Sequence, residues 1–227
     1  MKFYALVGLC LVWWAPSTLA ATPCYDTIHA SCGTEEFSAY DAASCTAEWG
    51  AFPRLGNDTN RLIALHIKHS MQYLLTANYF NEWNVNRPGF HAFFSKLADE
   101  EWNSAIDIMT HMLKRGGRLD DNFKLELPKN FENRQNEVES LAWALDLEKE
   151  MALQTLHLAY NSNHVPKEMQ NLPRDAEFAD FLAERLNAIT VLRIKHMSNY
   201  VNILGQIMGS GMDKAYAMFT FDHEILK

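Results

Sequence analysis

The sequence is poor in residues that interrupt helices. Its 227 residues include 10 glycines and 7 prolines, and these gather at a few points. After the first 20 residues or so, no segment holds the roughly 18 consecutive apolar residues that a membrane-spanning helix needs. There is no internal repeat, no low-complexity tract and no strand-like alternation. These absences exclude a membrane bundle and a sheet protein, and they favour an all-α domain.

The chain also lacks an excess of positive charge. Aspartate and glutamate number 28 against 20 lysines and arginines, so the formal net charge is -8. This balance argues against nucleic acid as a partner, because a polyanion would be repelled. An acidic surface suits solubility and cation capture, although it is too common to decide between functions.

The first 20 residues form the one conspicuous apolar run. Met1 and Lys2 precede the apolar stretch 3–14, and small residues stand at Thr18 and Ala20. This pattern predicts a secretory signal peptide over 1–20, and it is too short and wrongly flanked for a membrane anchor. We therefore expect the mature protein in the secretory pathway or outside the cell, with one domain of ordinary size.

The few cysteines lie near the start of the chain. Cys10 leaves with the signal peptide, so the mature chain keeps Cys24, Cys32 and Cys45, all in an N-terminal extension over 21–56. An odd number of cysteines in an oxidising compartment predicts a disulfide to another chain. The alternative is one internal disulfide with a capped or free thiol.

A further modification pattern follows the extension. Asn57, Asp58 and Thr59 match the acceptor triplet for N-linked glycosylation, a triplet that also arises by chance. The main domain is expected over 57–227.

Helical periodicity dominates from residue 60 onward. We expect four long helices over about 60–83, 88–114, 133–160 and 175–208, and a short fifth helix over about 212–225. Thr59 or Asn60 should cap the first helix, and Leu74 and Ile189 are among the residues expected to face inward. The aperiodic stretch between the second and third helices is long enough to cross the bundle. These two helices should therefore run in the same direction.

Carboxylates interrupt the apolar stripes of two helices. Glu100 and Glu101 lie in the second helix, and Glu148 occupies a position in the third where the period calls for a hydrophobic residue. An ionised carboxylate in a bundle core costs several kcal/mol unless it is paired, protonated or bound to metal. Metal is the favoured explanation, and the alternative is a carboxylate that reaches the helix edge or meets a cation.

Four sequence blocks give these features a family resemblance. They are Tyr79-Phe80, Arg115-Gly116-Gly117-Arg118, the block Ala144-Leu145-Asp146-Leu147-Glu148-Lys149, and Gly209-Ser210-Gly211. In order and spacing they resemble the corresponding blocks of ferritin subunits, from about residue 57 to the C-terminus. The signal peptide and cysteine-bearing extension resemble the secreted subunits of insects. The resemblance implies a ferritin-like four-helix bundle with a long crossover and a short fifth helix.

The resemblance also implies iron as cargo. Ferritin subunits assemble into a 24-subunit shell, into which Fe2+ passes and in which Fe3+ is stored as a mineral. In the secreted insect ferritins two chain types build one shell, one that oxidises iron and one that helps to mineralise it. The partners implied for this chain are heavy-type subunits and copies of itself.

The family's ferroxidase centre distinguishes the two chain types. It uses a Glu and a Tyr on the first helix, Glu-x-x-His on the second, Glu on the third and Gln on the fourth. Carried over by position, the residues here are His66, Tyr73, Glu101 with Ser104, Glu148 and Thr190. His66, Ser104 and Thr190 replace three ligands, and hydroxyls are poor iron ligands. The resemblance thus predicts a degenerate centre in which Glu100, Glu101 and Glu148 hold at most one weakly bound metal ion.

Two further acidic pairs have roles in the family. Asp99 and Glu100 fall where light-type chains seed the mineral, although Lys96 could instead form a helical ion pair with either. Asp180 and Glu184 fall near the three-fold channel. The alternative is that Asp180 and Glu184 simply lie on a solvent-exposed helix face beside Arg185.

A histidine pair adds a lesser candidate. His66 and His69 lie three residues apart on the first helix, a spacing that could clamp a divalent ion. Histidine pairs on helices are more often hydrogen-bonded or exposed residues.

These observations favour a light-chain-type subunit of a secreted ferritin, with the oxidase activity supplied by a heavy-type partner. One alternative is a ferroxidase with an altered site built from His66, Tyr73, Glu101 and Glu148. Another is a secreted helical signalling ligand, since such ligands are also four-helix bundles with long crossovers.

Overall fold

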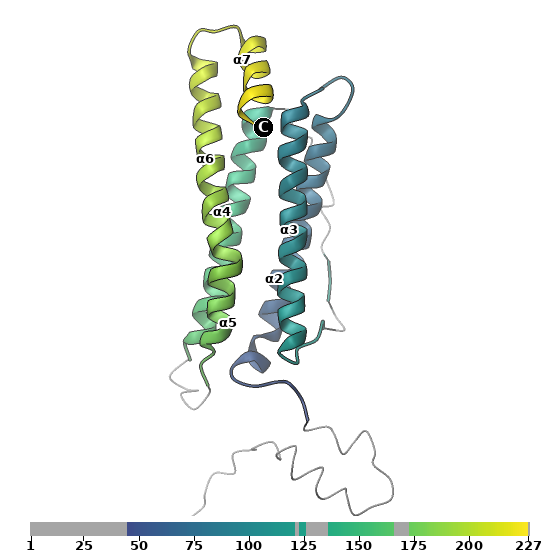
Figure 1. The fold of residues 1–227 in the computed structure, drawn as a ribbon, viewed down its shortest axis with the longest axis vertical. Coiled ribbons are helices and arrows are strands. Elements are labelled where there is room, and N and C mark those ends of the chain that lie inside the picture. Colours follow the sequence, from purple (N-terminus) through teal and green to yellow (C-terminus); the bar gives the residue numbers. More distant parts are fainter. Residues whose placement is uncertain (1–44, 121–122, 126–135, 166–172, 227) are drawn as a thin grey trace, which may run out of the picture. The chain divides into compact units, whose positions relative to one another are not determined.

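Four long helices form a bundle, and a short fifth helix lies at one end of it (Figure 1). The computed structural model describes residues 45–120, 123–125, 136–165 and 173–226. The helices are α2 (Phe52–Phe80), α3 (Pro88–Lys114), α4 (Glu137–Asn163), α5 (Ala176–Phe181), η2 (Leu182–Asn187), α6 (Ala188–Gly209), α7 (Lys214–Thr220) and η3 (Phe221–Ile225). Segments α5, η2 and α6 follow one another without a break as the fourth long helix, and η2 and η3 are π-helical. The predicted fold class is confirmed.

Helices α3 and α4 run in the same direction (Figure 1). The first residues of both lie together, because Arg87 Nε, just before α3, is 2.9 Å from Glu137 Oε1 at the start of α4. The connection between the two helices must therefore travel the length of the bundle, as its length predicted.

The first helix begins earlier than expected. Helix α2 starts at Phe52, with Pro53 in its first turn, where a proline needs no hydrogen-bond donor. The prediction that Thr59 or Asn60 caps the helix is wrong, since both lie inside it. Thr59 is fully buried, and its hydroxyl donates to the carbonyl of Leu55 at 2.8 Å. The compact helical unit runs from Ala47 to Lys227.

Helix α3 ends as its glycines predicted. Gly116 has φ +78°, in the left-handed region that glycine tolerates best. The amide of Gly117 then donates to the carbonyl of Met112 at 2.9 Å, which satisfies one of the free carbonyls at the helix end. The chain turns sharply here and enters the long connection.

The π-helical turn η2 shifts the register of the fourth helix. A regular α-helix would place Ile189 inward, as predicted, but Ile189 is 46% exposed and Thr190 is 3% exposed. A π turn holds more residues than an α turn. The residue that faces inward after Leu186 is therefore Thr190, four residues on, in place of Ile189. Leu74 of α2 was also predicted inward and is instead 45% exposed.

A polar layer divides the buried core into two apolar halves. One half is built around Ile63, Ile108, Met151 and Leu182. The other includes Phe80, Phe90, Phe94, Leu141, Leu204 and Phe221. Between them lie the buried polar side chains of His66, His69, Ser70, Glu101, Glu148, Thr190 and Arg193. Buried charges of this kind need close partners.

A second buried arginine ties the far end of the bundle together. Arg115, just after α3, pairs with Asp175 through Nη2 and Oδ2 at 2.7 Å and also with Glu177. Its guanidinium lies 3.9 Å from the ring centre of Trp49, a stacking geometry that favours arginine over lysine. Asp175 also caps α5 by accepting from the amide of Phe178. One side chain thus joins the start of α2, the end of α3 and the start of α5.

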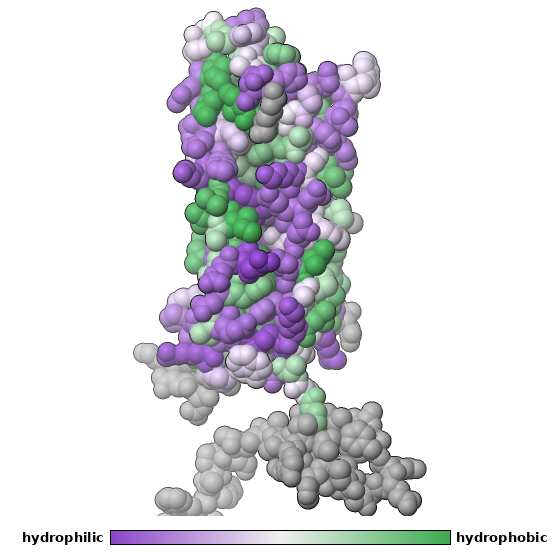
Figure 2. All heavy atoms as spheres, in the orientation of Figure 1, coloured by the Kyte–Doolittle hydropathy of each residue, from purple (hydrophilic) through white to green (hydrophobic). Residues whose placement is uncertain are grey.

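Apolar patches interrupt the polar surface over α6 and over the lower part of α3 (Figure 2). On α6 the exposed apolar side chains are Ile189, Val191, Leu192 and Ile203, and on α3 they are Trp102, Ile106 and Leu113. Patches of this kind are typical of protein contact surfaces. Among the described residues, no helix combines the length and apolar character needed to cross a membrane.

The C-terminal segment depends on a glycine at the start of α3. A Cβ at Gly89 would lie 1.9 Å from the carbonyl oxygen of Asp222. The buried carboxylate of Asp222 accepts from the amide of Phe90 at 2.9 Å. The Gly89→Ala variant should therefore lose about 1–3 kcal/mol of stability, because the added methyl group forces the two segments apart.

Gly205→Ala is the matched control, since a Cβ at Gly205 in α6 meets no atom within 4 Å. Alanine there should stabilise the helix by up to about 1 kcal/mol. Chemical unfolding of both variants measures the difference. Equal unfolding free energies would contradict the packing of η3 against α3.

Candidate functional site

The centre of the polar layer is an ion-pair triad from three helices. Glu101 of α3 and Glu148 of α4 are both fully buried, and Arg193 of α6 reaches between them. Arg193 Nη1 is 2.6 Å from Glu101 Oε1, and Arg193 Nε is 3.0 Å from Glu148 Oε2. One guanidinium thus bridges the two carboxylates that stood out in the sequence.

Helix α2 supplies the partners for the remaining carboxylate oxygens. His66 Nδ1 is 2.7 Å from Glu101 Oε2, and the Tyr73 hydroxyl donates to Glu148 Oε1 at 2.9 Å. Each carboxylate therefore has one hydrogen-bonded oxygen, and its other oxygen lies in an ion pair with Arg193 that lacks hydrogen-bond geometry. These contacts lower the cost of burying the charges.

The two carboxylates titrate very differently. Burial raises the pKa of Glu148 to about 7, and the charge of Glu101 adds to the rise, which Arg193 and Tyr73 oppose. Burial would raise the pKa of Glu101 too, but His66 and Arg193 outweigh it and lower that pKa to about 2. Since a single guanidinium serves both groups, the pair titrates as a coupled unit. The charge of the triad therefore changes chiefly through Glu148.

The neighbouring aromatic and basic groups are also shifted. Burial and the adjacent Glu148 raise the pKa of the Tyr73 hydroxyl well above its ordinary value, so Tyr73 remains a hydrogen-bond donor. Burial lowers the pKa of Arg193, but the two carboxylates outweigh it and raise that pKa overall. Arg193 is thus a permanent cation at this site.

Three other predicted residues surround the triad. The Ser104 hydroxyl donates to the carbonyl of Glu100 in its own helix at 2.9 Å. The Thr190 hydroxyl donates to Leu186 O at 3.0 Å and accepts from Arg193 Nη2 at 3.3 Å. Glu100 is only partly buried, and it lies 3.7 Å from Arg193 Nη1. The two hydroxyls are therefore occupied by local bonds.

His69 lies beside the triad and is 1% exposed. Burial lowers its pKa to about 4, against the opposing charge of Glu101, so its imidazole is neutral at physiological pH. Within the described part of the chain, its Nδ1 has no hydrogen-bond partner. The predicted clamp by His66 and His69 would have to compete with Glu101 for the ring of His66.

Arg193 stands where a metal ion was predicted. The predicted metal ligands Glu100, Glu101 and Glu148 all lie within 4 Å of its guanidinium. In the described ranges, no three or more His, Cys, Asp and Glu side chains are arranged to hold a metal ion. The geometry matches the alternative in which Glu148 meets a cation.

The other predicted acids lie at the surface. Asp99, Asp180 and Glu184 are exposed. Lys96 Nζ is 3.9 Å from Glu100 Oε1, which is the helical ion pair considered as an alternative to mineral nucleation. Arg185 pairs with Asp107 of α3 at 3.0 Å. The nucleation and channel roles stay predictions.

Two of the predicted disulfide residues, Cys24 and Cys32, lie outside the described residues, so the pairing of Cys45 stays a prediction. Asn57, the predicted glycosylation site, is described and is exposed on α2.

Sequence reasoning missed Arg193. The inward stripe of the fourth helix runs Leu186, Thr190, Arg193 and Met197, with spacings of four, three and four residues. This spacing could have identified Arg193, because Arg193 lies three residues after Thr190, a position carried over from the family resemblance, and continues the inward stripe. A search for hydrophobic residues and metal ligands passes over an arginine.

Comparison with known proteins gives this bundle a family. The ferritin-like domain matches residues 57–164. A ferritin light chain of Trichoplusia ni is 32% identical over 240 residues, covering 100% of this chain and 99% of the relative. This chain belongs to the ferritin family. The predicted resemblance to secreted insect subunits is confirmed.

Two further matches extend the comparison along most of the subunit. A ferritin light chain of Drosophila melanogaster is 27% identical, with 90% of this chain and 89% of the relative covered. The crystal structure of Trichoplusia ni secreted ferritin superposes with a TM-score of 0.78 at 31% identity, covering 91% of this chain and 98% of that one. This chain is therefore similar to insect ferritin subunits along nearly its whole length.

The raised pKa of Glu148 predicts a pH dependence of stability. A folded chain that holds this proton more tightly than the unfolded chain loses stability as pH rises between about 4.5 and about 7. Each pKa unit corresponds to about 1.4 kcal/mol. In Glu148→Gln this loss is absent, so the variant should gain stability relative to the wild type across that window.

Glu150→Gln is the matched control, because it removes an exposed carboxylate from the same helix. Chemical unfolding at several pH values between 4.5 and 7.5 measures the difference in unfolding free energy. A difference between Glu148→Gln and the wild type that does not change with pH would contradict the assigned pKa.

Proposed function

We propose that this chain is a light-chain-type, iron-storage subunit of a secreted heteromeric ferritin shell. It contributes shell structure and supports the ferric mineral, and a heavy-type partner supplies the oxidation of Fe2+. The observation that carries this proposal is the guanidinium of Arg193 between Glu101 and Glu148. A fixed cation there takes the place that iron would need.

The donor set argues against a two-iron centre. Such a centre needs enough anionic and imidazole donors to hold two Fe2+ ions and to stabilise the charge that appears on oxidation. Here two carboxylates share one guanidinium, and Ser104 and Thr190 contribute only hydroxyls that bond to their own helices. The residues do not fit the centre.

Electrostatics adds to this shortage of ligands. Two unit positive charges about 4 Å apart repel by about 4 kcal/mol at an effective dielectric constant of about 20. An iron ion carries two or more charges and would have to displace or approach the Arg193 guanidinium. The site therefore disfavours Fe2+ as long as Arg193 holds its position.

The features outside the triad agree with a role in the shell. Exposed apolar patches on α3 and α6 suit contacts between subunits (Figure 2). The exposed acids Asp180 and Glu184 would attract cations at a channel, and Asp99 with Glu100 would offer carboxylates to ferric ions. Secretion is supported by the signal-peptide pattern and by a related structure described as a secreted ferritin.

Different observations argue against the two alternatives, the signalling ligand and the altered ferroxidase. Membership of the ferritin family argues against a signalling ligand. An altered ferroxidase built from His66, Tyr73, Glu101 and Glu148 would need Arg193 to leave. Because Arg193 is buried and holds both carboxylates, its departure would break two buried ion pairs before iron could bind.

The Arg193→Gln variant tests the proposal. Removing one partner of a buried ion pair costs about 3–5 kcal/mol, so the metal-free variant should unfold at a lower temperature. Zn2+, which binds carboxylate and imidazole ligands without redox chemistry, should then restore stability by occupying the space between Glu101 and Glu148. Thermal unfolding with and without Zn2+ measures both effects.

Arg185→Gln is the control, because its exposed pair with Asp107 should be worth less than about 1 kcal/mol. It should respond to Zn2+ as the wild type does, through surface sites alone. A wild-type protein that gains as much from Zn2+ as Arg193→Gln would show that the guanidinium does not exclude metal.

A further inference from the structure

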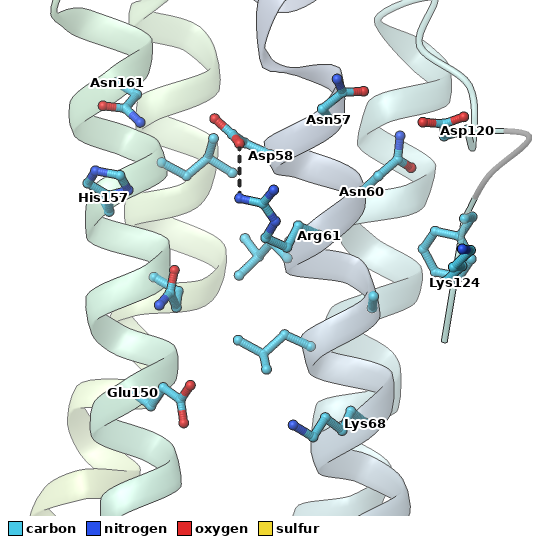
Figure 3. A pocket seen from close by; sticks show the side chains of 16 residues that line it. Asn57, Asp58, Asn60, Arg61, Lys68, Asp120, Lys124, Glu150, His157 and Asn161 are labelled. Carbon is cyan, nitrogen blue, oxygen red and sulfur yellow. Dashed lines mark ion pairs between the residues drawn. The ribbon is translucent and has the colours of Figure 1, made fainter. Parts of the chain in front are cut away.

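A polar groove of about 640 Å³ runs across α2, between α4 on one side and Asp120, Phe123 and Lys124 on the other (Figure 3). Asp58 and Arg61 of α2 lie between the two helices, and His157 and Asn161 belong to α4 (Figure 3). The triad of Glu101, Glu148 and Arg193 does not line it. The groove therefore needs its own explanation.

The predicted glycosylation triplet lies at this groove. Asn57 lines the groove and its side chain is exposed. Asn57-Asp58-Thr59 is the only triplet of the Asn-x-Ser/Thr pattern in the 227 residues. The groove and the acceptor residue thus coincide.

A second asparagine contributes to the groove lining. Asn60 lines the groove and is only 8% exposed. Its Nδ2 donates to the carbonyl of Arg118 at 3.4 Å. This bond ties α2 to the chain that follows α3, so it fixes one wall of the groove.

We propose that Asn57 carries an N-linked glycan whose first sugars lie in this groove. In the transfer, Asn57 Nδ2 bonds to C1 of an oligosaccharide held on a polyprenyl pyrophosphate. The C1–O bond to the pyrophosphate breaks, the lipid pyrophosphate leaves with the bonding electrons, and the amide loses one proton. The inference rests on the secretory route of the proposed function, because that donor is found there.

The buried position of Thr59 requires the glycan to be attached before the chain folds. The triplet lies inside α2, where Thr59 is fully buried and its hydroxyl is held by the carbonyl of Leu55. A transferase that needs the Asn57 and Thr59 side chains together cannot reach both in the folded helix. The glycan must therefore be attached while the chain is still entering the secretory compartment.

The groove offers what a sugar needs. Its lining mixes positively charged, negatively charged and neutral hydrogen-bonding groups, including Lys68, Asp120, Lys124, Glu150, Gln154 and His157. Asp58 and Arg61 already pair at 3.7 Å, so the lining presents no strong excess of one charge. The hydroxyl and N-acetyl groups of a sugar can hydrogen-bond to these side chains, and the ring of Phe123 offers an apolar face. A neutral polar ligand fits this lining better than an ion does.

Expression of the full chain with its leader in cultured insect cells tests the attachment. Glycosidase release should convert Asn57 to aspartate in the peptide that spans it, as read by mass spectrometry of the secreted protein. Thr59→Ser should keep the modification, and Asn57→Gln should lose the glycosidase-dependent shift in mobility. Secreted protein with an unmodified Asn57 would overturn the inference and leave the ferritin proposal standing. Retention in the cytosol would overturn the secretory route itself.

Endoglycosidase trimming tests the place of the sugars. Native protein should be trimmed several-fold more slowly than the denatured chain, because the groove shields the first sugars. The matched control is the double variant Asn57→Gln, Trp83→Thr, which moves the acceptor to Asn81 after α2. Trp83 is 93% exposed, so its replacement disturbs little. Equal trimming rates for the native glycans at Asn57 and Asn81 would overturn the groove assignment.

Discussion

The charge balance of the core depends on Arg193. Its guanidinium forms ion pairs with both Glu101 and Glu148, which are fully buried, and these three residues come from α3, α4 and α6. Helix α2 completes the layer through His66 and Tyr73. Every long helix therefore contributes to one polar layer, on either side of which the apolar side chains pack. Because a charge left unpaired at this depth costs several kcal/mol, the layer also restricts how the helices can pair.

The same layer connects the fold to the proposed function. A bundle with inward carboxylates has two ways to balance them, by binding metal or by supplying a cation of its own. In this subunit a side chain supplies the cation, so the fold does not need iron for its stability. This arrangement supports the proposal that shell building and mineral support are the work of this chain and that a partner oxidises the iron.

Periodicity predicted most of the fold. The bounds of α3 agree with prediction because Pro88 and the glycines at 116 and 117 mark both ends. The start of α2 was placed too late, since Pro53 was not recognised as a first-turn residue. Ile189 was wrongly placed inward, because a π turn has no clear sequence signature, although Met197 and Leu204 are buried as predicted.

The candidate site was predicted in part. The inward position of Glu101 and Glu148 followed from their place on apolar stripes. The contact of Tyr73 with Glu148 joins two of the positions to which the family resemblance pointed. Arg193 was missed, because only hydrophobic residues and metal ligands were considered on the stripe that continues from Thr190. An arginine is also rarely expected in a core, so only the coordinates reveal the partner of the two carboxylates.

Iron oxidation tests the central claim most directly. Shells made of this chain alone and the native particle purified with its partner chains would be mixed with Fe2+ in air in a stopped-flow instrument. The account predicts rapid oxidation by the native particle and a rate near that of buffer for shells of this chain alone. Rapid oxidation by shells of this chain alone would contradict it, because Glu101 and Glu148 would then serve iron in spite of Arg193.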